Sequence, residues 1–151
     1  MGEEEGNFWH TMTLLPGKIL LMVGGMQNRE GSIWLMDLNG PQWDWLWENK
    51  PEEWPHLWEV RHRRDGHSAT LIGTNVFLFG GYWSGYKNDL WVLDSTTMEL
   101  KEYHNHRGPV PEPRARHGAV ALEGKLYVFG GYGGNYLNDL HQLNPEDLLD
   151  L

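Results

Sequence analysis

The sequence contains no cysteine, and this absence excludes several kinds of site. Without thiols the chain forms no disulfide and no thiolate metal site, and it has no cysteine nucleophile. No apolar run approaches the ~20 residues that span a bilayer. The N-terminus, residues 1–5, is acidic where a secretory leader needs a cationic region. We therefore expect a soluble protein of the cytoplasm or nucleus with no membrane partner.

Positive charge is also scarce, because 12 Lys and Arg residues stand against 21 Asp and Glu residues, for a net charge of −9. A nucleic-acid site needs a basic face that neutralises phosphates. The one basic cluster, residues 61–64, is short and lies among acidic segments. The sequence therefore predicts no nucleic-acid partner.

Glycine is abundant, with 19 residues, and paired glycines mark an internal repeat. The segment 77–82, FLFGGY, returns fifty residues later as 127–132, YVFGGY, and a weaker copy, LLMVGG, occupies 20–25. A repeat of about fifty residues built from short strands is typical of propeller blades. The glycines of the three copies are Gly24, Gly25, Gly80, Gly81, Gly130 and Gly131.

Each copy is expected to contain short antiparallel strands joined by tight turns, which is the pattern of a β-meander. The first strands are predicted at 8–15, 67–72 and 117–122, and the turns at 16–17, 73–75 and 123–125. The second strands end on the glycine pairs, and loops of six or seven residues lead to third strands at 32–38, 89–94 and 139–143. Fourth strands are predicted around the alternating tryptophans at 43–47 and at 100–104, and the third copy has none.

The second strands of copies two and three, 76–79 and 126–129, are apolar on both faces. A sheet with one solvated face would alternate with polar residues, so these strands are expected to be covered above and below. Stacking of one sheet on the next around an axis provides that cover. Truncation of either Phe79 or Phe129 to Ala is then expected to cost about 3–5 kcal/mol.

Three motifs carry a resemblance to kelch repeats: Gly80-Gly81-Tyr82, Asn88-Asp89-Leu90-Trp91, and the Pro-x-Pro-Arg-x-x-His segment 111–117. The resemblance covers nearly the whole chain and is specific over 66–144. It implies an all-β fold, an incomplete kelch-type β-propeller of about three antiparallel blades with up to four strands each. The blades are placed at about 8–48, 66–104 and 116–151, with connectors 49–65 and 105–115. Leu100 stands where the family usually has a blade-closing Trp, and the third blade lacks its fourth strand.

Kelch propellers usually close with about five to seven blades. Three blades would form an open arc whose two outer faces are exposed and apolar, which monomers rarely tolerate. Three solutions follow: the chain is a piece of a longer protein, two copies pair as a homodimer into one ring, or another protein caps the arc. We favour the first.

The loops between second and third strands are expected to open on one side of the arc, together with the connectors between blades. Loops at one end of a rigid scaffold commonly carry recognition, and Tyr, Trp and Arg are enriched in interface hot spots. The alternative is that these side chains pack on the glycine turns or on a neighbouring blade. The candidate binding residues are Tyr82, Trp83, Tyr86, Tyr132, Tyr136, Arg64, Arg114 and Arg116.

Recurrence at the same repeat position favours a structural role over a catalytic one. His67 and His117 are therefore expected to bond a neighbouring backbone group. The Asn-Asp pairs that contain Asp89 and Asp139 are expected to bond their own turns.

No metal, cofactor or catalytic residue is predicted. His104 and His106 have a spacing that suits Zn or Cu but lack an obvious third ligand. Among kelch-like enzymes, the copper-radical type needs a Tyr cross-linked to Cys, and the iron-dependent specifier proteins carry a Glu-x3-Asp-x3-His run. The sequence has neither, and it has no phosphate-binding loop or nucleophile elbow.

The expected function is therefore a non-catalytic interaction module that holds a protein or peptide ligand on its long-loop face. The resemblance implies scaffold, substrate-adaptor or cytoskeletal roles. The alternative is a piece of a propeller enzyme or carbohydrate-binding protein whose active blades lie elsewhere. Trp54 and Trp58 then provide either a platform for a sugar or peptide, or packing of a long connector onto its blade.

Overall fold

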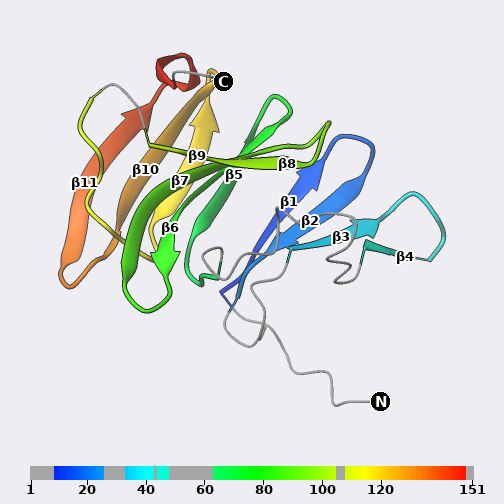
Figure 1. Ribbon diagram of the computed structural model, residues 1–151, viewed down its shortest axis with the longest axis horizontal. Helices are drawn as coiled ribbons and strands as arrows, with labels where there is room; N and C mark the ends of the chain where they lie inside the picture. Colours follow the sequence, from blue (N-terminus) through cyan, green and yellow to red (C-terminus); the bar gives the residue numbers. More distant parts are fainter. Residues whose placement is uncertain (1–8, 26–32, 43, 48–62, 105–107, 149–151) are drawn as a thin grey trace.

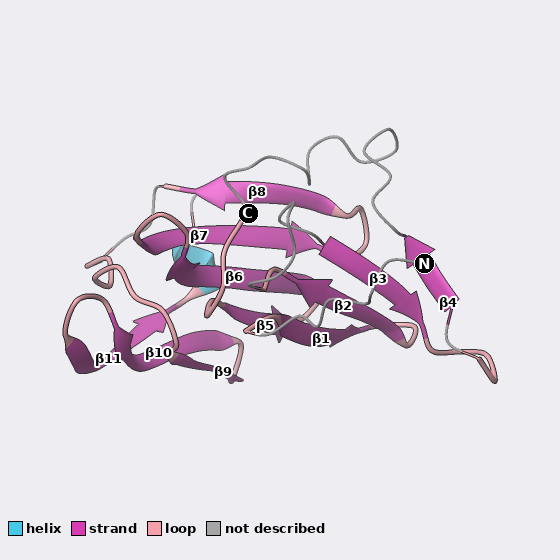
Figure 2. Ribbon diagram, turned by 90° about the horizontal axis from the view of Figure 1, so that it is seen from below, coloured by secondary structure: helices cyan, strands magenta, loops and turns pink. Residues whose placement is uncertain are grey.

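The computed structural model describes residues 9–25, 33–42, 44–47, 63–104 and 108–148, and they form three antiparallel sheets of four, four and three strands (Figure 1). The sheets follow one another along the molecule as successive blades (Figure 2). The predicted incomplete propeller is confirmed. Blade 1 contains β1 (Thr11–Leu15), β2 (Ile19–Val23), β3 (Ile33–Asp37) and β4 (Asp44–Trp47); blade 2 contains β5 (Ser68–Ile72), β6 (Asn75–Tyr82), β7 (Tyr86–Asp94) and β8 (Glu99–Tyr103); blade 3 contains β9 (Gly118–Leu122), β10 (Lys125–Tyr132) and β11 (Tyr136–Leu143).

The first strands of the blades lie together at the inner edge of the arc, because β5 contacts both β1 and β9. Each blade then runs outward in chain order, with every strand antiparallel to the one before. This arrangement places the loops of equivalent hairpins at the same end of the molecule. The β6–β7 and β10–β11 loops lie at the lower edge in Figure 1, and the β5–β6 and β9–β10 turns lie at the opposite edge.

The sequence predicted that each second strand ends on its glycine pair, and this holds for blade 1, where β2 ends at Val23, directly before Gly24. In blades 2 and 3 the expectation is wrong, because the glycine pairs lie inside β6 and β10. They form bulges, at which the register shifts between Phe79 and Gly81, and pairing resumes with Tyr82 opposite Tyr86. Both glycines of the pair have positive φ, 66° and 102°, which lets the strand bend without a side-chain clash. The third strands therefore begin at Tyr86 and Tyr136, and the loops shrink to three residues, 83–85 and 133–135.

Two apolar cores lie between the blades, one in each seam. The first seam packs Leu21, Val23 and Ile33 of blade 1 against Leu78 and Trp91 of blade 2. The second packs the opposite face of blade 2 against blade 3, with Phe77, Phe79, Leu90 and Val92 facing Leu126 and Val128. Strands that are apolar on both faces are thus covered on both sides, as predicted for blade 2. Leu148, which follows the short 3₁₀ helix η3 (Pro145–Asp147), completes the second core.

Blade 3 departs from this pattern, because its far face is open. Phe129 occupies the position of Phe79 but its side chain is 54% exposed, whereas that of Phe79 is 5% exposed. The expected burial of Phe129 is therefore wrong for this chain: no following blade covers it within the described residues. Large apolar side chains are exposed at both ends of the arc, Met12 and Leu14 on blade 1 and Val120, Leu122, Phe129 and Leu140 on blade 3.

The described part of the chain contains no helix with the length and apolarity that crossing a bilayer requires.

Candidate functional site

Arg64 and Arg114, which we expected at the binding surface, are buried instead, with exposed fractions of 4% and 0%. Arg114 donates to both carboxylate oxygens of Asp139, at 2.7 and 2.8 Å, and to the carbonyl of Gly130 at 3.0 Å. Arg64 makes the same three bonds with Asp89 and Gly80. Each arginine therefore fixes a connector to the bulge and third strand of its own blade, and neither belongs to the candidate binding surface.

The two aspartates correct a second expectation, since they bind these arginines and not their own turns. Opposite charges and a bidentate geometry make such bonds strong. Hydrogen bonds from Arg114 lower the pKa of the Asp139 carboxyl below its usual range. At Asp89, burial is the largest single effect and works to raise the pKa, but the hydrogen bonds and the charge of Arg64, with a hydrogen bond from Trp91, together lower it. Both carboxylates are therefore ionised at neutral pH.

The same arginines also join each blade to the preceding one through their backbone. The carbonyl of Arg64 accepts from Gly25 at 3.1 Å, and the carbonyl of Arg114 accepts from Gly81 at 2.8 Å. The first glycine of each pair leaves the room for this contact: a Cβ on Gly80 would lie 2.7 Å from the Arg114 carbonyl oxygen and 2.9 Å from Cε1 of His117. At Gly130, beside which the described residues place no further blade, the nearest atom to such a Cβ is 3.2 Å away.

His67 and His117 join the blades along their inner edges. The Nε2 atom of His67 lies 2.8 Å from the hydroxyl of Thr11, and that of His117 lies 2.9 Å from the hydroxyl of Ser68. The recurring histidines thus have a structural position, in which Nε2 meets a side-chain hydroxyl of the preceding blade. A backbone hydrogen bond with the preceding blade, at Val23 for His67 and at Phe79 for His117, also acts on each imidazole. Burial, with the nearby charges of Arg64 and Arg114, lowers their pKa values to about 3 and about 4, so both imidazoles are neutral at pH 7.

The tyrosines that flank the β6–β7 and β10–β11 loops, on what we call the long-loop face, form a continuous ladder across blades 2 and 3. Tyr82, Tyr86, Tyr132 and Tyr136 meet edge to face in that order, with ring centroids 5.1, 5.6 and 5.2 Å apart. Edge-to-face geometry places the positive ring edge on the negative ring face. The ladder ends in Tyr136, whose side chain is 92% exposed. The structure therefore brings together all four tyrosines predicted from the sequence.

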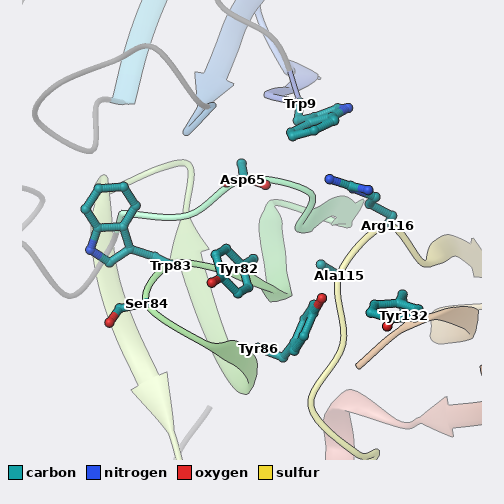
Figure 3. Close-up of a pocket in the computed structure, with 9 residues that line it drawn as sticks. All are labelled: Trp9, Asp65, Tyr82, Trp83, Ser84, Tyr86, Ala115, Arg116 and Tyr132. Atoms are coloured by element: carbon teal, nitrogen blue, oxygen red, sulfur yellow. The ribbon is translucent and has the colours of Figure 1, made fainter. Parts of the chain in front are cut away.

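A pocket of about 680 Å³ opens beside this ladder on the long-loop face (Figure 3). Tyr82, Trp83 and Tyr86 line it from the β6–β7 hairpin, and Tyr132 lines it from blade 3. Arg116, in the connector before β9, forms another part of the pocket wall. The complete lining is Trp9, Asp65, Tyr82, Trp83, Ser84, Tyr86, Ala115, Arg116 and Tyr132.

Sequence reasoning missed Trp9, which faces Arg116 across the top of the pocket in Figure 3. The Arg116 guanidinium lies 4.0 Å from the centre of a Trp9 ring. Trp9, Gly66 and Arg116 each precede the first histidine of a blade, and all three have φ near +60°. Their backbones bond in series, Gly66 to the Trp9 carbonyl and Arg116 to the Gly66 carbonyl, at 3.1 and 2.7 Å. Their equivalence in the repeat was the available signal.

Asp65, also missed, lies in the same wall with an exposed fraction of 7%. Its backbone pairs with that of Tyr82 in an isolated bridge, as Ala115 pairs with Tyr132. Burial raises the pKa of the Asp65 carboxyl, and the charge of Arg116 opposes that shift. Within the described part of the chain no group donates a hydrogen bond to this carboxylate.

The sequence also suggested a tryptophan platform and a pair of metal-binding histidines. Trp54, Trp58 and His106 lie outside the described residues. His104 lies 3.4 Å from Glu102 on an exposed edge. Among the residues that the structure describes, no three His, Asp or Glu side chains gather to hold a metal ion.

Comparison with known proteins finds the same repeat. The model of the KLHDC2/KLHL20/DRC7 Kelch-repeats domain matches residues 3–149. The chain is similar to Kelch domain-containing protein 3 of Homo sapiens, with 30% identity over 97 residues, and to that of Bos taurus, with 29% identity over 97 residues. These alignments cover 60% of this chain and 23% of each relative, so the chain spans under a quarter of the relatives' length.

Proposed function

Since the chain belongs to the kelch-repeat family, whose members are generally protein-interaction modules, we propose that it is a non-catalytic binding module for a protein or peptide ligand. The ligand lies on the long-loop face, in the pocket between the β6–β7 loop and the connectors. The cytoplasm or nucleus is its proposed location, and scaffold or adaptor its proposed role.

The observation that carries this proposal is the composition of the pocket. Large, rigid aromatic rings surround a concave space, and Tyr82, Trp83 and Trp9 keep more than two fifths of their surface exposed. Aromatic side chains and arginine supply most hot-spot energy in protein interfaces. The rings lose little conformational entropy on binding, because the ladder already orders them.

A random heptapeptide library displayed on phage and selected on the immobilised chain tests the proposal. We expect an enriched pool whose binding falls at least tenfold on the double variant Tyr82→Ala, Tyr132→Ala. The matched control, Thr74→Ala with Glu123→Ala, alters exposed turns at the opposite edge and is expected to bind normally. No enrichment, or equal binding by both double variants, would contradict the proposal. Enrichment on a glycan array in place of peptides would favour the carbohydrate-binding alternative.

The two open faces of the arc support a second part of the proposal: further kelch blades cover them. The outer face of blade 3 repeats the face of blade 2 that blade 3 itself covers, with Phe129 at the position of Phe79. The molar mass of this chain in solution, measured by light scattering, tests whether a longer chain or a second copy provides the covering blades. A mass near 17.5 kDa supports blades from a longer chain, and twice that mass supports a homodimer.

A further inference from the structure

The residues that break the repeat gather in the pocket. Blade seams use the same residue in both copies: arginine at 64 and 114, histidine at 67 and 117, aspartate at 89 and 139. At the pocket the equivalents differ. Asp65 corresponds to Ala115, Gly66 to Arg116, and Trp83 to Gly133. The seams explain the repeated arginine, histidine and aspartate, so the unrepeated groups of the pocket are the ones that no shared architectural role explains.

Among the described pocket residues that differ between the copies, Asp65 alone has a charged group in a buried residue without a hydrogen-bond or ion-pair partner. The Asp65 residue is 7% exposed, and no described group donates a hydrogen bond to its carboxylate. A buried carboxylate without a donor is costly, and Ala115 shows that the fold makes the same backbone bridge without it. The fold therefore does not require a carboxylate at this position.

The rings around Asp65 favour a cationic partner for it. Their π faces attract guanidinium and ammonium groups, and two already carry guanidinium groups, Arg63 over Trp83 at 5.1 Å and Arg116 over Trp9 at 4.0 Å. Neither arginine forms an ion pair with Asp65 in the described structure. The net charge of −9 also attracts a basic partner at long range.

We propose that the pocket selects a basic side chain, lysine or arginine, of the ligand peptide, with Asp65 as the specificity-determining residue. The ammonium or guanidinium group donates to the Asp65 carboxylate, and the alkyl stem packs on Tyr82 and Tyr86. This inference rests on the proposed peptide-binding function and names the residue type that the site takes.

Sequencing of the heptapeptide pool selected on the wild-type chain provides the first test. Lysine or arginine is expected at one shared position in most enriched peptides, and that preference should disappear in a pool selected on Asp65→Asn. This variant keeps the shape and removes the charge. Asp94→Asn, the same change at the end of β7 opposite Asn75 and far from the pocket, is the matched control and should select the basic residue normally.

A second measurement isolates the contact itself. One enriched peptide and its norleucine analogue, in which only the basic group is lost, are titrated into the wild-type and Asp65→Asn chains by calorimetry. We expect each single change to weaken binding at least tenfold and the two together to add little more. The melting temperature of Asp65→Asn should equal or exceed that of the wild type, because the variant removes a charge that burial disfavours.

The outcomes separate the two proposals. An enriched pool that binds in the aromatic pocket but prefers acidic residues would assign selectivity to Arg116 and overturn this inference alone. An unchanged basic preference on Asp65→Asn would do the same. A library that yields no pocket-dependent peptide would overturn the proposed function, and this inference with it.

Discussion

The guanidinium of Arg114 holds both carboxylate oxygens of Asp139, and Arg64 holds Asp89 with the same two distances, 2.7 and 2.8 Å. In each case the arginine carbonyl also accepts a hydrogen bond from a glycine of the preceding blade. One residue per seam thus connects two blades through its backbone and organises the second blade through its side chain. These buried arginines also bind the carbonyls of Gly80 and Gly130, at the bulges that precede the tyrosine hairpins.

Replacing Arg114 by Met should lower the free energy of unfolding by about 1–3 kcal/mol, because the Gly130 carbonyl loses its buried donor. The Asp139 carboxylate is 40% exposed and keeps water and His141 as partners, so it adds little to this cost. The control is Lys101→Met, which removes an exposed pair at 3.8 Å and should cost under about 1 kcal/mol. Urea denaturation measures both. Equal small losses would show that the buried pair does not stabilise the seam.

Stability should decline as the pH falls from about 6.5, well before carboxylates titrate. The folded pKa values of His67 and His117 are about 3 and about 4, below the value near 6.5 of an unfolded chain. Between these values only the unfolded state binds the proton, so the free energy of unfolding decreases by up to about 1.4 kcal/mol per pH unit for each imidazole.

Urea midpoints between pH 7.5 and 4.5 measure this dependence, and His117→Gln should reduce its slope by roughly one proton. The lowered pKa values of Asp89 and Asp139 add a separate loss only below about pH 4. A stability that is flat down to pH 5 would contradict the burial of the two histidines as neutral groups.

Phe79 and Phe129 occupy equivalent repeat positions but should respond differently to truncation. Phe79→Ala is expected to cost about 3–5 kcal/mol, since it leaves a cavity between blades 2 and 3. Phe129→Ala, on the open face, should change the unfolding free energy of the dilute chain by less than about 1 kcal/mol. Similar losses for both variants would mean that another blade or copy covers Phe129 in solution.

Gly80 and Gly130 have nearly the same φ, 66° and 68°, so substitution by Ala imposes the same backbone strain on each. Only at Gly80 would the new Cβ press on the following blade, 2.7 Å from the Arg114 carbonyl oxygen. Gly80→Ala should therefore be less stable than Gly130→Ala by about 1–3 kcal/mol, the usual cost of overpacking. Thermal denaturation of the two variants checks this, and a difference near zero would argue against the close seam.

The contact between Tyr86 and Tyr132 should couple the two blades at the binding face. Their rings meet edge to face at 5.6 Å, and such pairs contribute about 0.5–1.5 kcal/mol beyond burial. A double-mutant cycle with Tyr86→Leu and Tyr132→Leu measures the coupling free energy of unfolding. A coupling below experimental error would mean that the ladder does not persist in solution.

Much of the fold follows from the sequence, because repetition supplies information that a single segment lacks. The glycine pairs, the strand order and the shared side of the tyrosine loops all derive from the fifty-residue offset. The bulges were not predictable from pattern alone: paired glycines suit a strand end as well as a bulge, and only the pairing of Tyr82 with Tyr86 distinguishes them.

The candidate site was predicted in part. The tyrosines and Trp83 lie on the face where they were predicted. Arg64 and Arg114 were wrongly placed on that surface, because a charged residue in a connector usually has an exposed side chain, whereas both are buried. Arg64 and Arg114 recur at the same offset as the histidines, so the argument from recurrence applied to them equally. Asp65 and Trp9 were missed because their side-chain types do not recur in the other copies. The backbone bonds of Asp65 with Tyr82, and of Gly66 with Trp9, place both residues at the same pocket.

Chemical-shift mapping tests the central claim most directly, namely that ligand recognition occurs where the repeat is broken. The ¹⁵N-labelled chain is titrated with one heptapeptide from the selected pool. The amides of Asp65, residues 82–86 and Arg116 should shift, and those of the turns 73–75 and 123–125 should not. Shifts confined to these opposite turns, or to the open face of blade 3, would contradict the account.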